Sequence, residues 1–543
     1  MSDYPESPFK DVLHTNHIPS ASEIVQINEH IRAPKQRLTE VDAERTHLLT
    51  VLRTLSKEKT ALERYILPHA VLISPIRLVP DDVLREIFLH CLAHPYASTM
   101  DAHRPPLLLG RVCSRWRTLL YATSAMWANF NIAIGSRGPN FNGRDGLGIQ
   151  QWLSRPREVV LSISVRKRAL DMSRWAQDTL KAYLDKIFQF SEKIREMSVQ
   201  LYPVSTYGKA DVAQATLLEL CSSDLPLLRK LTVRFGPHTY TASERWAGTA
   251  LFAAPQLHSL TLINMGHPIV ETMPAESWAR ITYLDIALHH VDWTRGISAT
   301  EAHELLSQCR SLKVVYMTIV DEDEGIDAEG EVEQPFLETL SISEDSGSIY
   351  GLLERLVVPA LRHLRYVGRL WVEYPSPMLV LLENYGESVE QLEIDVYTLT
   401  LDDLVGCLRL LPNATRITQL ARFSSWPIEF LNPLRTFLDL LILQADAEQH
   451  LCPKLSNLTF EQGVFGTVDV RQVLEFLESR MKTSISNLRE VAFGNVSGID
   501  LAEVPQIREL FQPFLSRGLR VFVNCEATLR RSSSIHETIS YFM

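Results

Sequence analysis

Between residues 107 and 130 the apolar positions of the chain lie on one side of a predicted helix. The stretch LLLGRVCSRWRTLLYATSAMWANF repeats large apolar residues at steps of three and four, which is the spacing of one helical face. The polar residues Arg111, Arg115 and Thr118 fall outside this face, and Trp127 follows a short polar break. Such a face needs a partner surface, in the protein's own core or on another protein. Its residues are Leu108, Val112, Trp116 and Leu119 or Leu120.

A second helical pattern covers residues 35–67. This segment contains no proline or glycine, is rich in strong helix formers, and is expected to end at Pro68. Its apolar residues alternate at steps of three and four over about four heptads, as in a coiled coil. Arg45 and Lys59 occupy two positions of the same seam, which favours the alternative of an amphipathic helix folded back on its own protein. The apolar seam residues are Leu38, Val41, Leu48, Leu52, Leu55, Leu62 and Ile66.

A third pattern, SPIRLVPDDVLREIFLHCL at residues 74–92, predicts a short helix that starts near Pro80. Proline suits the first turn of a helix, and Asp81 and Asp82 follow where the helix dipole favours negative charge. Two or three short helices in about 55 residues bury too little apolar surface to be stable alone. Part of that surface is therefore expected to contact another protein. The apolar face of this helix consists of Val83, Leu84, Ile87 and Phe88.

A short unit recurs in the long C-terminal part of the chain, for example as LPLLRKLTV, APQLHSLTL and VPALRHLRY. The middle apolar residues of successive units are 29, 24, 31, 25, 24 and 28 residues apart, and leucine-rich repeats are about 20–29 residues long. Helix-like segments such as 299–309 and 401–411 lie between the units. A strand followed by such a helix predicts one coil of a solenoid, and an irregular α/β domain is the alternative. The middle apolar residues are Leu231, Leu260, Leu284, Val315, Leu340, Leu364 and Leu392.

Composition and charge limit the class of partner. The 543 residues carry a formal net charge of −11 without an extended lysine or arginine cluster, so neither a nucleic acid nor a membrane is expected as the main partner. The seven cysteines form no CxxC pair, which is typical of reduced thiols in a cytoplasmic or nuclear protein. The polar N-terminus differs from a signal peptide, and residues 1–34, with four prolines, are predicted to be mostly disordered.

No catalytic motif can be assigned. The sequence GRDGLG (143–148) lacks the preceding strand and the GK[ST] of a phosphate-binding loop, and it is predicted to be a plain loop. The pair His289–His290 is more typical of a strand end than of a metal site. The acidic run 321–333 lacks the glycine spacing of a calcium-binding loop. The sequence therefore predicts no enzyme, no cofactor and no metal site.

The order VPDDVLREIF, LLLGRVCSRWRTLL and then MW resembles the F-box, in particular the form common in mushroom-type fungal proteins. The resemblance covers residues 74–130, and Val79 and Ser124 replace the leucine and proline that are usual at these positions. The later part of the chain resembles the degenerate leucine-rich repeats that follow many F-boxes, without their frequent closing asparagine. The F-box resemblance implies docking to the Skp-family adaptor, and through it to the cullin, of a ubiquitin ligase. The residues expected to bind the adaptor are Pro80, Leu84, Ile87, Phe88, Leu108, Val112 and Trp116.

These patterns together predict an α+β multidomain chain. Its expected parts are a disordered N-terminus (1–34), an amphipathic or coiled-coil helix (35–67), a small all-α F-box (74–130) and an irregular α/β leucine-rich-repeat solenoid (150–543). The hypothesis for its function is a substrate-recognition adaptor that holds a protein near the ubiquitin-charged enzyme and performs no bond chemistry itself. The alternative is an F-box scaffold or regulatory protein that acts outside the ligase. A hydrolase ranks below both, because no nucleophile and base can be paired.

The polar strand positions between the inward residues are expected to form the substrate-binding surface. Solenoids bind partners on their extended concave face, where such positions lie. For each single residue, a plain solvated sheet surface is the alternative. The candidates are Lys230, Thr232, Arg234, Ser259, Thr261, Tyr283, Asp285, His363, Arg365, Gln391, Glu393 and Asp395.

Overall fold

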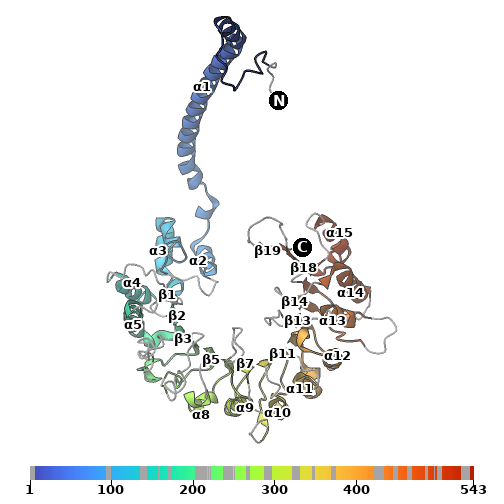
Figure 1. Cartoon of the computed structure of the whole chain (residues 1–543). Coiled ribbons are helices and arrows are strands. Elements are labelled where there is room, and N and C mark those ends of the chain that lie inside the picture. Colours follow the sequence, from blue (N-terminus) through green and yellow to red (C-terminus); the bar gives the residue numbers. More distant parts are fainter. Residues whose placement is uncertain are drawn as a thin grey trace. The chain divides into compact units, whose positions relative to one another are not determined.

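The structure of the protein is a computed structural model (Figure 1). The chain divides into two compact units, Met1–Ile87 and Phe88–Met543, and the boundary falls inside one short helix. The structure describes residues 7–92, 100–134, 144–156, 159–167, 174–201, 217, 219–220, 222–235, 249, 251–263, 269–286, 296–320, 330–344, 349–368, 375–420, 433–443, 450–461, 468–482, 487–493, 496–497, 504–526 and 538–542.

The first unit consists mainly of helix α1 (Ala21–Leu72), which is 52 residues long. A capping box begins it: the Ser20 hydroxyl accepts a hydrogen bond from the Glu23 amide, and the Glu23 carboxylate accepts one from the Ser20 amide. The helix therefore extends beyond the predicted 35–67 at both ends and includes residues 21–34, which corrects the expectation of disorder there. Pro34 and Pro68 both lie inside it. Proline therefore does not end this helix at either position, although it lacks the amide that donates to the preceding turn.

The described residues between Ser74 and Trp127 form short helical pieces. They are η1 (Pro75–Arg77), α2 (Asp81–His90), η2 (Leu109–Arg111), α3 (Ser114–Ala122) and η3 (Ser124–Trp127). The single apolar stripe predicted over residues 107–130 is wrong, because the helix is interrupted at Cys113. That residue has an extended backbone, with φ −157° and ψ 172°, and its sulfur accepts a hydrogen bond from the Trp116 amide. Cys113 therefore caps α3 and separates Leu108 and Val112 from the face of α3.

One large sheet dominates the second unit. Among the described residues it joins fifteen strands in chain order, all paired in parallel except for the last pair, in which β19 runs antiparallel to β18. Its strands are β1 (Asn129–Ile134), β2 (Leu161–Lys167), β3 (Ile194–Leu201), β4 (Lys230–Phe235), β5 (Ser259–Ile263), β6 (Tyr283–Ile286), β7 (Val314–Ile319), β9 (Thr339–Glu344), β11 (His363–Val367), β12 (Gln391–Ile394), β13 (Arg416–Gln419), β14 (Asn457–Phe460), β16 (Glu490–Phe493), β18 (Arg520–Glu526) and β19 (Thr538–Phe542). Two short parallel pairs are separate from it: β8 (Val332–Glu333) with β10 (Leu356–Val357), and β15 (Val468–Asp469) with β17 (Val496–Ser497).

The parallel pairing places the middle apolar residues of the repeat units next to one another, from Leu231 in β4 to Leu392 in β12. All seven are at most 1 % exposed, which confirms the predicted inward positions. The same row starts earlier in the chain, with Phe130, Ile163 and Met197. These residues are more than 30 positions apart, so the search for a shorter period missed their strands.

Helices connect many of the successive strands, and Figure 1 shows them along one side of the sheet. The segments predicted as helices at 299–309 and 401–411 are confirmed as α9 (Ala299–Gln308) and α12 (Leu401–Arg409). The predicted loop at 143–148 is wrong, since α4 begins at Arg144 and buries Ile149, Trp152 and Leu153. The other α-helices within the described residues of this unit are α5 (Arg174–Phe188), α8 (Ala275–Trp278), α10 (Tyr350–Arg355), α11 (Pro377–Tyr385), α13 (Pro433–Leu441), α14 (Val470–Lys482) and α15 (Val504–Leu515).

Candidate functional site

The residues of α2 that were expected to bind an adaptor differ in exposure. Pro80 is exposed, and Ile87 is 40 % exposed. Leu84 is fully buried, which corrects the expectation that it contacts a partner directly. Val83, also on α2, is 45 % exposed. The exposed apolar surface of α2 therefore consists of Val83 and Ile87, whereas Leu84 contributes to packing.

In the second unit the apolar candidates also differ in exposure. Leu108 and Val112 are 40 % and 58 % exposed. Phe88 is fully buried and packs against the half-buried Trp116, with ring centroids 4.8 Å apart and planes inclined by 59°. Phe88 therefore belongs to the core, which corrects its assignment to a contact surface. Among the adaptor-binding candidates in this unit, Leu108 and Val112 are the two most exposed side chains.

Trp127 belongs to the protein's own core. It is fully buried, stacks on Tyr121 at a centroid distance of 5.4 Å, and meets the edge of Trp152 of α4 at 4.8 Å. The Arg155 guanidinium lies 4.1 Å from the centre of its ring. Phe130 of β1 also contacts Trp152, at 5.4 Å. This aromatic cluster joins the short helices to the first strand of the sheet.

The polar strand positions form two rows across the sheet, here called the sheet face. Each row consists of residues that are paired from one strand to the next, and one row starts at Thr232 and the other at Lys230. Arg234 is exposed near the end of β4. Four positions of these rows were missed by the sequence analysis, although the alternation in CRSLKVVYM and QPFLETLSI marks them: Val314, Tyr316, Thr339 and Ser341. The two rows run Thr232, Thr261, Asp285, Tyr316, Ser341, Arg365, Glu393 and Lys230, Ser259, Tyr283, Val314, Thr339, His363, Gln391.

A charged cluster on the sheet face centres on Glu393. Its Oε1 lies 3.0 Å from His363 Nε2, and its Oε2 lies 3.4 Å from Arg365 Nε. Arg365 Nη1 also donates to the Ser341 hydroxyl at 3.3 Å. The hydrogen bond from His363, helped by the charges of His363 and Arg365, lowers the pKa of Glu393 against the effect of its burial. The three strands β9, β11 and β12 thus present linked charges of both signs.

Two tyrosines lie beside this cluster in the rows. The ring centroids of Tyr283 and Tyr316 are 5.9 Å apart. Burial, then the charge of Asp285, raises the pKa of Tyr283 to about 12, and burial also raises the pKa of Tyr316. Both phenols therefore keep their protons around neutral pH and remain hydrogen-bond donors. Half-buried tyrosines combine apolar area with a polar group, as residues central to protein interfaces often do.

Four of the expected substrate-binding residues are buried, which corrects their assignment to a contact surface. Thr232, Thr261 and Asp285, which are paired in sequence across β4, β5 and β6, are 9 %, 6 % and 8 % exposed. Asp395 is 4 % exposed, and its carboxylate accepts a hydrogen bond from the Tyr397 amide at 3.0 Å. Asp395 therefore caps the short helix η8 (Val396–Thr398).

Replacing Glu393 by glutamine should lower the melting temperature at pH 7, and the difference from the wild type should shrink below about pH 4. The lowered pKa of Glu393 means that its carboxylate stabilises the fold above the pKa it has in the unfolded chain. This stabilisation is lost as the pH falls through the lower, folded-state pKa. Calorimetric melting at several pH values measures the effect. Equal differences at neutral and acid pH would contradict it, and Glu390→Gln, in an exposed ion pair with Arg362, is the control with little expected effect.

The cysteines within the described residues differ in exposure. Cys309, Cys407 and Cys452 are buried, whereas Cys91 and Cys113 are exposed. Burial raises the pKa of the Cys309 and Cys452 thiols to about 12. Where the structure describes the chain, no three His, Cys, Asp or Glu side chains gather in a way that could hold a metal ion. His289–His290 and residues 321–329 of the acidic run lie outside the described residues.

Comparisons with known proteins assign no family to this chain. No family model matches the chain, and no curated protein matches its sequence. Within the described residues, every helix is too short or too polar to cross a membrane. Two surfaces are therefore the candidates for function: the exposed apolar side chains within residues 74–130 and the sheet face.

Proposed function

We propose that this chain is the substrate-recognition subunit of a cullin-based ubiquitin ligase, in which residues 74–130 act as an F-box that docks the Skp-family adaptor. The supporting observation is the exposure of Leu108 and Val112, at 40 % and 58 %, directly before a helix that buries Leu119 and Leu120. A small helical segment that builds a core and still exposes large apolar side chains is typical of a protein-binding site. The resemblance of this segment to the F-box names the partner.

In this proposal residues 150–543, within the second unit, form a leucine-rich-repeat solenoid that binds the protein substrate. Its support is the parallel sheet in chain order, with one row of buried apolar residues that repeats every 24–31 positions from Leu231 to Leu392. A solenoid of such coils offers the strand side as an extended binding surface. The substrate contacts are the exposed and half-buried members of the sheet face, among them Tyr283, Tyr316 and Arg365. The chain is not an enzyme here, since it contributes only proximity between substrate and ubiquitin-charged enzyme.

The experiment that tests this function is purification of the tagged full chain from its own cells, followed by identification of what accompanies it. Adaptor and cullin together are the expected result. The adaptor without a cullin would favour the alternative of an F-box scaffold or regulatory protein that acts outside the ligase. Absence of the adaptor would contradict both.

Changing Tyr316 to serine together with Arg365 to glutamine should lengthen the half-life of the substrate without unfolding the chain. Both side chains are half-buried on the sheet face, and tyrosine and arginine often dominate binding energy at interfaces. Charge reversal at Arg365 is unsuitable, because it would place two carboxylates together at Glu393. Protein turnover is measured across the proteome. The proteins that become longer-lived should be the same ones that a variant unable to bind the adaptor stabilises. The control is Arg409→Gln, at an exposed position on α12, which should leave turnover unchanged.

A further inference from the structure

Helix α1 exposes large apolar side chains along its whole length. None of its 52 residues is buried. Leu38, Leu48, Leu52 and Leu55 are between 56 % and 61 % exposed. A regular helix with this much exposed leucine is stable in water mainly when a partner covers that face.

The apolar seam is longer than the sequence analysis expected, because the helix begins at Ala21. Ile24, Ile27 and Ile31 continue it toward the N-terminus with the same spacing. The seam covers about seven heptads, and a coiled coil needs roughly three or four. A polar residue at a single a position fixes the register and the number of helices in a coiled coil, and this seam has Arg45 and Lys59 at two such positions. The a positions are Ile24, Ile31, Leu38, Arg45, Leu52, Lys59 and Ile66, and the d positions are Ile27, Pro34, Val41, Leu48, Leu55, Leu62 and His69.

The two basic seam residues have acidic neighbours at the position that a second copy would present to them. Glu44 directly precedes Arg45, and Glu58 directly precedes Lys59, so both glutamates occupy g positions. In a parallel dimer in register, the residue at an a position lies beside a g residue of the other helix. That g residue is the one directly before the a residue of the same heptad position on the other helix. Glu44 and Arg45 form no ion pair with any described residue of their own chain, and Lys59 pairs only loosely with the exposed Glu63, at 3.7 Å. The charges of the seam are therefore complementary to those of an identical helix.

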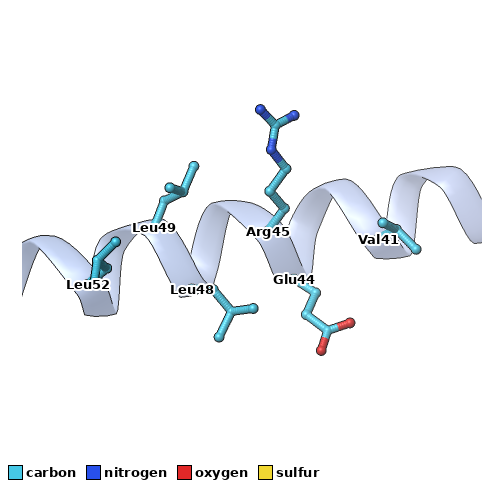
Figure 2. A pocket seen from close by; sticks show the side chains of 6 residues that line it. All are labelled: Val41, Glu44, Arg45, Leu48, Leu49 and Leu52. Atoms are coloured by element: carbon cyan, nitrogen blue, oxygen red, sulfur yellow. The ribbon is translucent and has the colours of Figure 1, made fainter. Parts of the chain in front are cut away.

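The shape of the seam also fits a second helix. Figure 2 shows its middle, where Arg45 and Leu49 project to one side of the helix and Glu44 and Leu48 to the other. A shallow hollow on this single helix is lined by six residues. The first four of them occupy d, g, a and d, which is the hole that receives an a side chain of a partner helix. The last four occupy a, d, e and a, which is the hole that receives a d side chain. The six residues are Val41, Glu44, Arg45, Leu48, Leu49 and Leu52.

We propose that α1 pairs with the α1 helix of a second copy of this chain, as a parallel two-stranded coiled coil in register. Arg45 and Lys59 then lie beside the other copy's residues 44 and 58, and the two chains form a homodimer. This inference does not depend on the proposed ligase function, since it rests on α1 alone.

Light scattering after gel filtration of the full chain should give the mass of a dimer, twice 61.7 kDa, at micromolar concentration. Leu48→Glu together with Leu55→Glu should raise the dissociation constant by at least about 100-fold and give a monomer, because both are d residues of the seam. The matched control is Leu67→Glu with Val71→Glu on the same helix. These residues are 66 % and 46 % exposed and lie outside the seam, so this variant should stay a dimer.

The register and direction are tested by exchanging charges. Arg45→Glu should weaken the dimer, because the new carboxylate lies beside Glu44 of the other copy. Adding Glu44→Arg should restore the dimer. A monomeric wild type would overturn the proposal, whether α1 folds onto its own chain or binds a different protein. A dimer that survives the two seam substitutions would also overturn it. Failure of the exchange to restore the dimer would overturn the parallel, in-register pairing.

Discussion

Replacing Leu108 and Val112 together by aspartate should abolish binding of this chain to the Skp-family adaptor. Truncating central interface residues typically costs about 2–4 kcal/mol, which is roughly a 30- to 1000-fold loss of affinity, and a charge at each position should reach the upper end. Because the two side chains are 40 % and 58 % exposed, the free energy of unfolding should change by about 0.5 kcal/mol or less for each. Titration calorimetry with purified adaptor and thermal melting followed by circular dichroism measure the two effects.

The matched control changes two other exposed apolar residues of the second unit, Phe336 and Leu510, to aspartate. They are 58 % and 47 % exposed, and the double variant should bind the adaptor like the wild type. Leu84 is a poor choice for this experiment, because truncating a fully buried leucine costs about 2–5 kcal/mol of stability by itself. Tight binding by the folded Leu108→Asp, Val112→Asp variant would remove the docking proposal and the ligase function with it.

Replacing Trp127 by alanine should destabilise the second unit by about 3–5 kcal/mol. The substitution removes the ring that stacks on Tyr121 and meets Trp152, and Arg155 loses the nearer of its two aromatic contacts and keeps the one with Tyr121. The cavity lies where the short helices join β1, so these helices should loosen first and expose their buried leucines. Urea unfolding followed by circular dichroism measures the free energy, and hydrogen exchange locates the loosened region.

Two further variants separate this packing role from a general effect of losing an aromatic ring. Trp127→Phe keeps most of the contacts and should cost less than Trp127→Ala. Trp116→Ala removes a half-buried ring, whose centroid is 4.8 Å from that of Phe88, and should also cost less. An unfolding free energy for Trp127→Ala within about 1 kcal/mol of the wild type would contradict the assignment of Trp127 to the core.

The sequence by itself determined the inward strand residues from Leu231 to Leu392 and the helices α2, α9 and α12. These features depend on residues close in the chain: apolar alternation defines a strand, and steps of three and four define a helix. Leu231 and Leu392 could therefore be assigned to the interior from short stretches around them. The capping box at Ser20 is an equally local signal for the start of α1, and the expectation of disorder, which rested on the composition of residues 1–34, did not include it.

Only the tertiary structure decided which apolar residues within 74–130 are exposed. Phe88 and Val112 carry similar signals in the sequence, yet Phe88 is buried against Trp116 and Val112 is 58 % exposed. Exposure depends on neighbours that are distant in the chain: Phe88 of α2 packs against Trp116, which lies in a separate helix, α3. The same reason explains the cluster at Glu393: the pairing of β11 with β12 brings His363 and Arg365 to a carboxylate about 30 residues further along, and no local pattern contains that contact.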